Sequence, residues 1–311
     1  MGRADRPGMT DASAPPARPS VAVVGPGAIG TSVAAALHEA GVPVLLCGRS
    51  ARERLELRTG GRTTIVVPGP VRTDPAGVIA PVDLVLLAVK ATQIEAAAPW
   101  LAALCHAGTV VAVLQNGIEQ VEDVAPHVPG CPVVPAVVWF PAEALADGSV
   151  LLRGTPRLTL PDVPAARVVV DALAGGRCAV ELAADFRTVA WRKLVQNAVA
   201  GIMAATGRRA GVYRRDDVAT LARAYGRECL RVARAEGADL DDDVADRIVD
   251  DFRAAPVDQG TSILADRDAG RPLEWAARNG IILRRARAHG LPTPLGDVLV
   301  PLLAAASDGP G

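Results

Sequence analysis

The 311-residue sequence predicts an α/β fold, in which an N-terminal doubly wound parallel sheet precedes a C-terminal all-helical domain. Three observations predict it: apolar runs without polar alternation, a glycine-rich loop directly after the first run, and long amphipathic stretches after residue 184. Continuous Val, Leu and Ile runs are typical of parallel strands that are covered on both faces. The length also suits two domains better than one.

The predicted sheet domain spans residues 20–184 and follows a leader, residues 1–19, whose Pro, Ala and charged residues predict disorder. Its first elements read as strand, glycine loop, helix and strand. The expected strands are SVAVVG, VPVLLC, TTIVVPG, DLVLLAV, TVVAVL and CPVVPAVVW, and the expected helices are residues 28–40 and 91–104. The runs SVLLRG and PRLTLP are expected to form a hairpin that closes the domain.

The predicted helical domain, residues 185–311, shows amphipathic stretches and almost no strand pattern. The expected helices are residues 185–206, 215–236, 241–255, 274–289 and 294–305. Pro272, shortly after Gly270, suits the first turn of the helix that contains Glu274.

Composition excludes several classes of function. Lys plus Arg total 33 against 34 for Asp plus Glu, so the uniform basic field of a nucleic-acid-binding protein is missing. The apolar runs are far shorter than the roughly 20 residues that span a bilayer, and residues 1–19 lack the apolar core of a secretory signal. Five cysteines lie singly, with no CxxC pair and no histidine at metal-ligand spacing. We therefore expect reduced thiols, no metal site and a cytoplasmic protein without nucleic-acid or membrane partners.

A GPGAIG loop follows the first predicted strand and opens the first predicted helix. In this context the glycines permit a tight turn, a close approach of backbone to a pyrophosphate, and packing of the helix on the strand. The loop predicts a Rossmann-type dinucleotide site made by Gly25, Pro26, Gly27, Ala28, Ile29 and Gly30.

The end of the second strand indicates which dinucleotide binds. An acidic residue there would suit the ribose hydroxyls of NAD, whereas the sequence has Arg49 and Ser50 and thus favours NADP(H). Arg52 and Arg54 are either helpers or part of a solvated helix face. Lys90, at the carboxyl end of a predicted buried strand, lies where it would reach phosphate, ribose or substrate.

Six further positions carry polar groups that suit a site between the domains. Asn116 follows another strand and would hold the nicotinamide ribose or substrate oxygens, or else serve an Asn-Gly turn. Lys193 and Asn197 lie four residues apart, on one helix face, and either look into the cleft or belong to a solvated stripe. Ser262, Asp266 and Glu274 either belong to this site or lie on a capped, charged surface helix.

Taken together, the motifs resemble the ketopantoate reductase (2-dehydropantoate 2-reductase) family from Val21 to about Leu303. The motifs are GPGAIG, AVKATQ, LQNGIE, WRKLVQN, SILADRDAGRPLEW and NGIILRRARAHGLPTP, in this order. The resemblance implies reduction of the C2 ketone of ketopantoate to (R)-pantoate with NADPH, a step of pantothenate and coenzyme A biosynthesis. The active site would lie in the cleft between the domains.

The resemblance also implies roles for individual residues. Lys193 matches the general acid that protonates the developing alkoxide, and Glu274 matches the acidic residue that organises the lysine and the substrate. Ser262 matches a serine that binds the substrate carboxylate. Asn116 and Asn197 match asparagines that line the substrate and nicotinamide site. Arg49 and Lys90 match basic residues near the cofactor phosphate and the cofactor cleft.

Two departures from the family pattern bear on the substrate. Gly201 stands where many members have an asparagine, which would leave room and remove a polar partner. Trp139, Phe140 and Pro141 stand where smaller or hydroxylated residues are commoner. A paralogue that reduces another 2-oxo acid or ketone is therefore the main alternative. A noncatalytic NADP(H) sensor is a weaker one, because a sensor needs only the nucleotide site. Assembly as a homodimer is left open.

Overall fold

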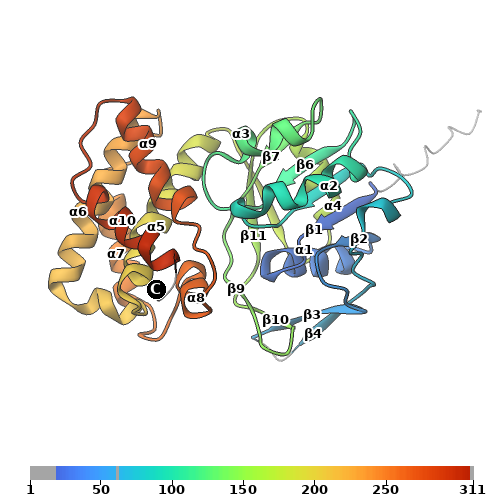
Figure 1. The fold of residues 1–311 in the computed structure, drawn as a ribbon, viewed down its shortest axis with the longest axis horizontal. Helices are drawn as coiled ribbons and strands as arrows, with labels where there is room; N and C mark the ends of the chain where they lie inside the picture. The colour runs from blue at the N-terminus through green and yellow to red at the C-terminus, as the bar shows by residue number, and fades with distance from the viewer. Residues whose placement is uncertain (1–18, 61–62, 309–311) are drawn as a thin grey trace, which may run out of the picture.

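The computed structural model describes residues 19–60 and 63–308. Figure 1 shows its two parts, the strand-containing part on the right and the helical part on the left. All but Pro19 of the expected leader lies outside the described residues. We propose that the domain boundary falls between the last strand and the long helix that starts at Phe186.

The central sheet has five parallel strands in the order β2-β1-β5-β6-β7. These strands are β1 (Val21–Val24), β2 (Val44–Cys47), β5 (Leu84–Leu87), β6 (Val110–Val113) and β7 (Val133–Pro135). The strand that follows β1 is β2, toward one edge of the sheet, and the strand that follows β5 is β6, toward the other edge. The loops after β1 and β5 therefore meet at a topological switch point. Ligands of open α/β sheets bind at such a point.

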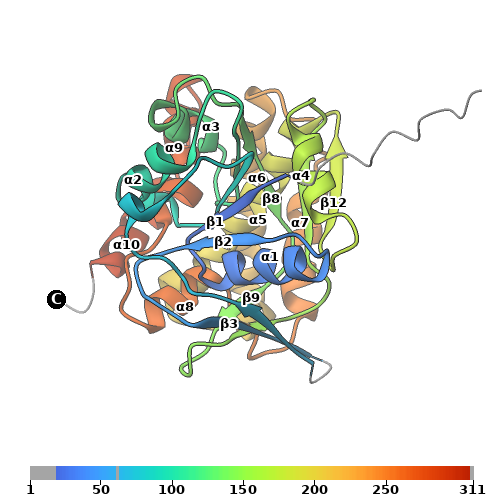
Figure 2. The same cartoon turned by 90° about the vertical axis from the view of Figure 1, so that its right-hand side faces the viewer.

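Helices cover both faces of this sheet, which is why β1, β5 and β6 are buried throughout. One face packs against α1 (Ala28–Glu39) and α4 (Ala166–Leu173). The other packs against α2 (Ile94–Leu104) and α3 (Gln120–Val124). Figure 2 shows α1 running beside β1 and β2. The predicted doubly wound sheet is thus confirmed.

Two smaller sheets flank the central one, with strand orders β4-β3-β10-β9 and β12-β11-β8. Their strands are β3 (Arg54–Thr59), β4 (Thr64–Pro68), β8 (Val137–Val138), β9 (Ala142–Ala144), β10 (Val150–Leu152), β11 (Arg157–Pro161) and β12 (Ala179–Ala183). The predicted hairpin is wrong, because β10 and β11 lie in different sheets. The intervening Gly154 has a φ of +75°, and Pro156 has no amide N–H for a ladder. The single strand expected in CPVVPAVVW divides at Ala136 into β7 and β8.

The helical domain packs around α5 (Phe186–Thr206), which contacts four other helices of this part. Its helices are α5, α6 (Asp216–Ala235), α7 (Val244–Ala254), α8 (Ser262–Asp268), α9 (Ile281–Ala288) and α10 (Gly296–Ser307). Short helical turns are η1 (Pro75–Gly77), η2 (Ala91–Gln93), η3 (Ala125–His127) and η4 (Ala210–Arg214), and η5 (Ala276–Gly280) is a π-turn. All five expected helices are found. The helix α8 is not among those five, although it coincides with the helix considered for Ser262 and Asp266.

The helix expected at residues 274–289 begins after Glu274, so Pro272 lies in the loop before it. This helix starts with the π-turn η5 and continues as α9. A π-turn widens the helix by one residue, and such turns often mark functional positions. Within the described ranges, no helix has both the length and the apolar character that crossing a membrane requires.

Candidate active site

The glycine loop between β1 and α1 has the form that its three glycines require. Gly25 has a φ of +89°, and a Cβ there would lie 2.6 Å from Val89 Cγ1 in the loop after β5. A Cβ at Gly30 would lie 2.2 Å from the carbonyl oxygen of Gly25. These two glycines therefore let the loop turn and let α1 lie against it.

Gly27 has a different role, because a Cβ there would meet nothing within 4 Å. Gly27 is exposed and is the N-cap of α1, with no side chain capping the first turn. No side chain thus competes for the N–H groups of that turn, and a helix N-terminus attracts negative charge. The conformation of the loop is that of a Rossmann-type glycine loop, and binding of a pyrophosphate by residues 25–30 stays a prediction.

Arg49 lies just past the end of β2 and is exposed. The end of β2 adjoins the glycine loop, since Gly25 N donates to Cys47 O at 2.9 Å and a Cβ at Gly48 would lie 2.9 Å from Pro26 Cδ. The backbone of Arg49 therefore lies close to the glycine loop, and a role in cofactor binding stays a prediction. Arg54, by contrast, lies in β3 beside Glu56 and Arg52 lies in the preceding loop, so the helix face considered for these two arginines is not there.

Lys90 connects the two domains at the edge of the central sheet. It follows β5, and its ammonium makes an ion pair with Asp266 of α8. The side chain of Asp266 is only 6% exposed, and Arg271 Nε also donates to it at 3.0 Å. The surface-helix interpretation of Asp266 is therefore wrong: its carboxylate is a buried partner for two cations.

Glu274 is also buried and joins the domains. Its carboxylate accepts hydrogen bonds from the backbone N–H of Ala91 and from Asn116 Nδ2, both at 3.2 Å. Asn116 Oδ1 in turn accepts from Asn197 Nδ2 at 3.2 Å. The residues expected at the site from three separate motifs thus form one continuous hydrogen-bonded chain, and the surface interpretation of Glu274 is wrong.

Arg278 extends this chain and was not predicted. Its side chain is 2% exposed, with Nη2 donating to Asn197 Oδ1 at 3.3 Å and Nη1 donating to Ser262 Oγ at 3.1 Å. Burial lowers the pKa of Arg278, while the charges of Glu274 and Asp266 act in the opposite direction. The guanidinium remains a cation at neutral pH. The spacing of Glu274 and Arg278, one helical turn apart, is the signal that sequence reasoning missed.

Lys193 lines a small pocket together with Asn116, Asn197 and the backbone of β8. Desolvation, together with the positive charges of Arg278 and Arg157, lowers the pKa of Lys193 to about 8. The stripe of Lys193 and Asn197 thus faces the interdomain site, as the cleft interpretation predicts. Glu274 accepts from Ala91 and Asn116, and Asn116 lines the same pocket as Lys193.

Gly201 leaves no room for a polar group, contrary to expectation. A Cβ at this position would lie 2.9 Å from Asn279 Nδ2 and 3.2 Å from Leu303 Cδ1. Asn279, in η5, is fully buried and donates to the carbonyl of Ala198 and to the hydroxyl of Tyr225. The space that an asparagine at 201 would fill is therefore occupied by another asparagine, from a different helix.

All five cysteines are free thiols, as expected. Burial raises the pKa of Cys47, Cys105 and Cys178 to about 12 each, so these thiols stay protonated at neutral pH. A protonated buried thiol is a poor nucleophile, which agrees with the structural role expected of them.

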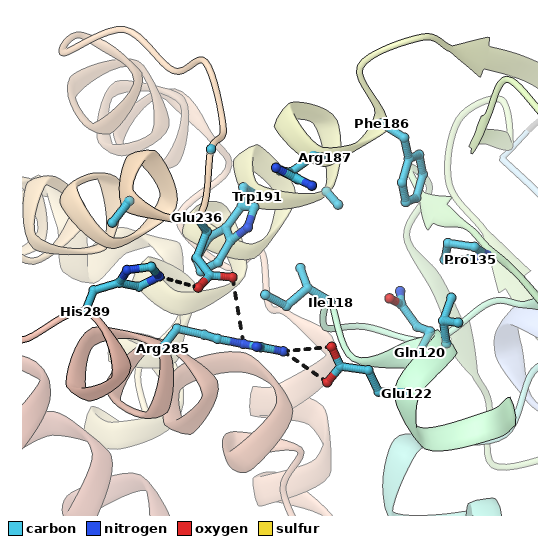
Figure 3. A pocket seen from close by; sticks show the side chains of 14 residues that line it. Ile118, Gln120, Glu122, Pro135, Phe186, Arg187, Trp191, Glu236, Arg285 and His289 are labelled. Atoms are coloured by element: carbon cyan, nitrogen blue, oxygen red, sulfur yellow. Dashed lines mark hydrogen bonds and ion pairs between the residues drawn. The ribbon is translucent and has the colours of Figure 1, made fainter. Parts of the chain in front are cut away.

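A larger cavity of about 530 Å³ shares Gln120 and Ala190 with the Lys193 pocket. Figure 3 shows Arg285 at its base between Glu122 and Glu236, with His289 beyond Glu236. Arg285 Nη2 donates to Glu122 at 3.0 Å, and His289 Nε2 lies 2.6 Å from Glu236. Because these pairs tie α9 to α3 and α6, we regard the cavity as part of the domain junction.

Two family models match the chain: "Ketopantoate reductase PanE/ApbA" over residues 21–165 and "Ketopantoate reductase PanE/ApbA C terminal" over residues 185–307. The 2-dehydropantoate 2-reductase of Mycobacterium tuberculosis is 60% identical over 291 residues, which cover 94% of this chain and 99% of the relative. That of Caulobacter vibrioides is 39% identical, covering 93% and 99%. The solved structure of a dimeric ketopantoate reductase from Staphylococcus aureus is 30% identical, with a TM-score of 0.83, and covers 93% and 98% of the two chains.

A glycine loop at the switch point of the sheet, together with a partly buried lysine in a pocket between the two parts, is typical of an oxidoreductase that uses a nicotinamide cofactor. Both halves of this design are matched by the family models, and the identities extend over nearly the whole chain. The chain belongs to the ketopantoate reductase family.

Proposed function

We propose that the chain reduces the C2 ketone of 2-dehydropantoate to (R)-pantoate with NADPH, in pantothenate and coenzyme A biosynthesis. The observation that carries the proposal is the continuous polar cluster between the domains, in which Lys193 and the chain Glu274–Asn116–Asn197–Arg278–Ser262 adjoin one another. A 2-oxo acid presents a carboxylate and a ketone, and the cluster offers cationic, amide and hydroxyl donors for both.

The glycine loop and the basic residues beside it hold the cofactor. Residues Gly25 to Gly30 accommodate the pyrophosphate at the start of α1, and Arg49 serves the 2′-phosphate. Lys90 lies between this loop and α8, and its charge faces the same cleft. When bound, the nicotinamide supplies the hydride. A preference for NADPH over NADH follows from Arg49 and from the lack of an acidic residue at the end of β2.

Lys193 acts as the general acid. Reduction of a ketone leaves negative charge on oxygen, and a protonated Nζ neutralises it by donating a proton. A pKa of about 8 makes this ammonium a stronger acid than an ordinary lysine while it stays mostly protonated at pH 7. Asn116 and Asn197 orient the oxygens of the substrate, and Glu274 fixes the amide of Asn116.

Ser262 binds the substrate carboxylate with support from Arg278. The serine hydroxyl is exposed at the first position of α8, and it accepts a hydrogen bond from the buried guanidinium. The hydroxyl proton is therefore free to point at an anion, and the nearby positive charge strengthens that bond.

A paralogue acting on another 2-oxo acid is the second candidate, and one observation favours it. Trp139 lies beside Lys193, where it would restrict the shape of the substrate. Gly201 does not favour this alternative, since Asn279 fills the space beside it. We also propose a cytoplasmic homodimer, on the grounds of the reduced thiols and of the dimer named for the S. aureus relative.

The test is an NADPH-consumption assay of the purified chain with ketopantoate and a panel of other 2-oxo acids. Lys193→Ala should lower the rate about 100-fold or more, because general acid catalysis contributes 10²–10⁴-fold. Arg215→Ala, which removes an exposed cation paired with Asp217, is the matched control and should keep the wild-type rate. Lysine-dependent turnover of another ketone, without turnover of ketopantoate, would select the paralogue.

A further inference from the structure

The ammonium of Lys193 has an aromatic neighbour. Its Nζ lies 5.1 Å from the centroid of the Trp139 ring. Within residues 19–60 and 63–308, no carboxylate forms an ion pair with Lys193, and the charges acting on it are the cations Arg278 and Arg157. A general acid must be held in a fixed position if it is to donate its proton to one atom of a substrate. The Lys193 ammonium is not held in this way by hydrogen bonds to an anion.

The Trp139 ring is itself held in place from two directions. Its indole Nε1–H donates to Thr159 Oγ1 at 2.9 Å, and its backbone N–H donates to the carbonyl of Arg157 at 2.9 Å. Thr159 is 4% exposed and belongs to β11, between β8 and β12. The ring is therefore attached to a sheet, and its face cannot turn away from the lysine without losing a buried hydrogen bond.

A second cation uses the same ring. The guanidinium carbon of Arg157 lies 5.1 Å from the Trp139 centroid, and Arg157 Nη1 donates to Glu181 at 2.7 Å. A ring face attracts a cation through its quadrupole without the full negative charge that would bind the ammonium tightly. The neighbouring charge of Arg157 acts to lower the pKa of Lys193. The arrangement fixes the position of the ammonium and still leaves it acidic.

We propose that Trp139 is a positioning residue for Lys193, an inference that rests on the proposed general-acid role of that lysine. The indole face takes the place of a carboxylate partner: it orients Nζ toward the pocket of Asn116 and Asn197 without neutralising it. Trp139 thereby acts on the proton-transfer step, and its contribution to the rate passes through Lys193.

The chain offers a direct spectroscopic test because it contains only two lysines, Lys90 and Lys193, among its 33 basic residues. Lysine labelled with ¹³C at Cε gives two side-chain methylene signals, and Lys90→Arg assigns them. A ring face shifts the nuclei above it upfield. We expect an upfield Lys193 signal in the wild type, a return to the ordinary position in Trp139→Leu, and a retained shift in Trp139→Phe. An unshifted wild-type signal would overturn the proposal.

Kinetics provide the second readout. Trp139→Leu should lower kcat about tenfold, within the 0.5–2 kcal/mol range of cation–π contacts, with an unchanged KM for NADPH and a larger solvent deuterium isotope effect. Trp139→Phe should lose less than Trp139→Leu. In the Lys193→Ala background, Trp139→Leu should cause no further loss, whereas a merely structural role would lower the rate in both backgrounds and overturn the proposal.

The two hypotheses fail separately. If Lys193→Ala keeps the wild-type kcat, the general-acid role is wrong, and the NMR shift alone then decides whether Trp139 holds the ammonium. If Lys193→Ala loses activity while Trp139→Leu keeps full activity and an unchanged Lys193 signal, the positioning role is overturned and the acid role stands. Thr159→Val, which removes only the anchor of the indole N–H, should broaden or reduce the ring shift even if Trp139→Leu does not fold.

Discussion

Asn197 Nδ2 donates to Asn116 Oδ1 at 3.2 Å, and this bond joins a helix of the C-terminal part to a loop of the sheet. Asn197 Oδ1 also accepts from Arg278, so one amide serves both sides of the cluster. The geometry of the site therefore depends on a residue that is 7% exposed and that belongs to α5, the central helix of its domain.

Replacing Asn197 with alanine should destabilise the fold as well as the site. It removes the acceptor of a buried guanidinium, and an unsatisfied buried donor costs about 1–3 kcal/mol. Chemical denaturation would measure this loss. Asn197→Asp keeps an acceptor for Arg278, so it should lose clearly less stability. Equal losses in both variants would argue against the hydrogen bond to Arg278 as the cause.

The rate should depend on the protonation of Lys193. A general acid works in its charged form, so kcat for reduction should be constant below pH 8 and should fall about tenfold per pH unit above the pKa near 8. Saturating substrate and cofactor between pH 6 and 10 would measure it. Lys193→Arg stays protonated over this range and should lose the basic limb together with most of the rate. A basic limb that persists in this variant would assign it to another group.

Arg49 should control the choice of cofactor. Arg49→Ala should raise the KM for NADPH about tenfold or more, since hydrogen bonds to charged groups contribute about 1.5–3 kcal/mol, and should leave the KM for NADH nearly unchanged. The ratio of kcat/KM for the two cofactors measures the effect. The same increase for both cofactors would show that Arg49 does not contact the 2′-phosphate.

Asp266 should matter for stability far more than its neighbour in the same helix. Asp266→Asn leaves Lys90 and Arg271 without their shared carboxylate, which we expect to cost about 1–3 kcal/mol, below the loss for a fully buried pair because the cations are partly exposed. Asp268→Asn removes an exposed carboxylate 3.5 Å from Arg209 and should cost less than about 0.5 kcal/mol. Urea unfolding of both variants gives the comparison.

Gly201→Asn should not improve the turnover of ketopantoate. The new side chain would press on Asn279 and Leu303, and overpacking of a core costs about 1–3 kcal/mol or more. We expect a lower melting temperature and an unchanged or lower kcat/KM, with Gly201→Ala intermediate. A stable variant with a higher kcat/KM would restore the hypothesis that position 201 lacks a polar partner for the substrate.

The local parts of the site could be predicted from the sequence, because they depend on periodicity and on short motifs. The glycine loop, Arg49, Asn116 and the helix face of Lys193 and Asn197 are of this kind. The roles of Arg278 and Asp266 could not be predicted in the same way, because both are charged residues in a polar segment and only the packing of α8 and η5 against the sheet edge buries them.

The failures of prediction concern contacts between distant segments. The local pattern of residues 150–161 predicts a hairpin, yet β10 pairs with β9 and with the distant β3, while β11 pairs with β8 and β12. Gly201 likewise gives no sign that a residue 78 positions later fills its space. Long-range pairing leaves no periodic trace in either segment.

The scarcity of lysine has a consequence for chemical modification. Apart from the amino group at the start of the chain, the only amines are those of Lys90 and Lys193, and both belong to the cleft. Acylation of a lysine on this chain therefore cannot be a silent surface event: it would remove either the partner of Asp266 or the proposed proton donor. Arginine, which resists acylation, carries the remaining positive charge.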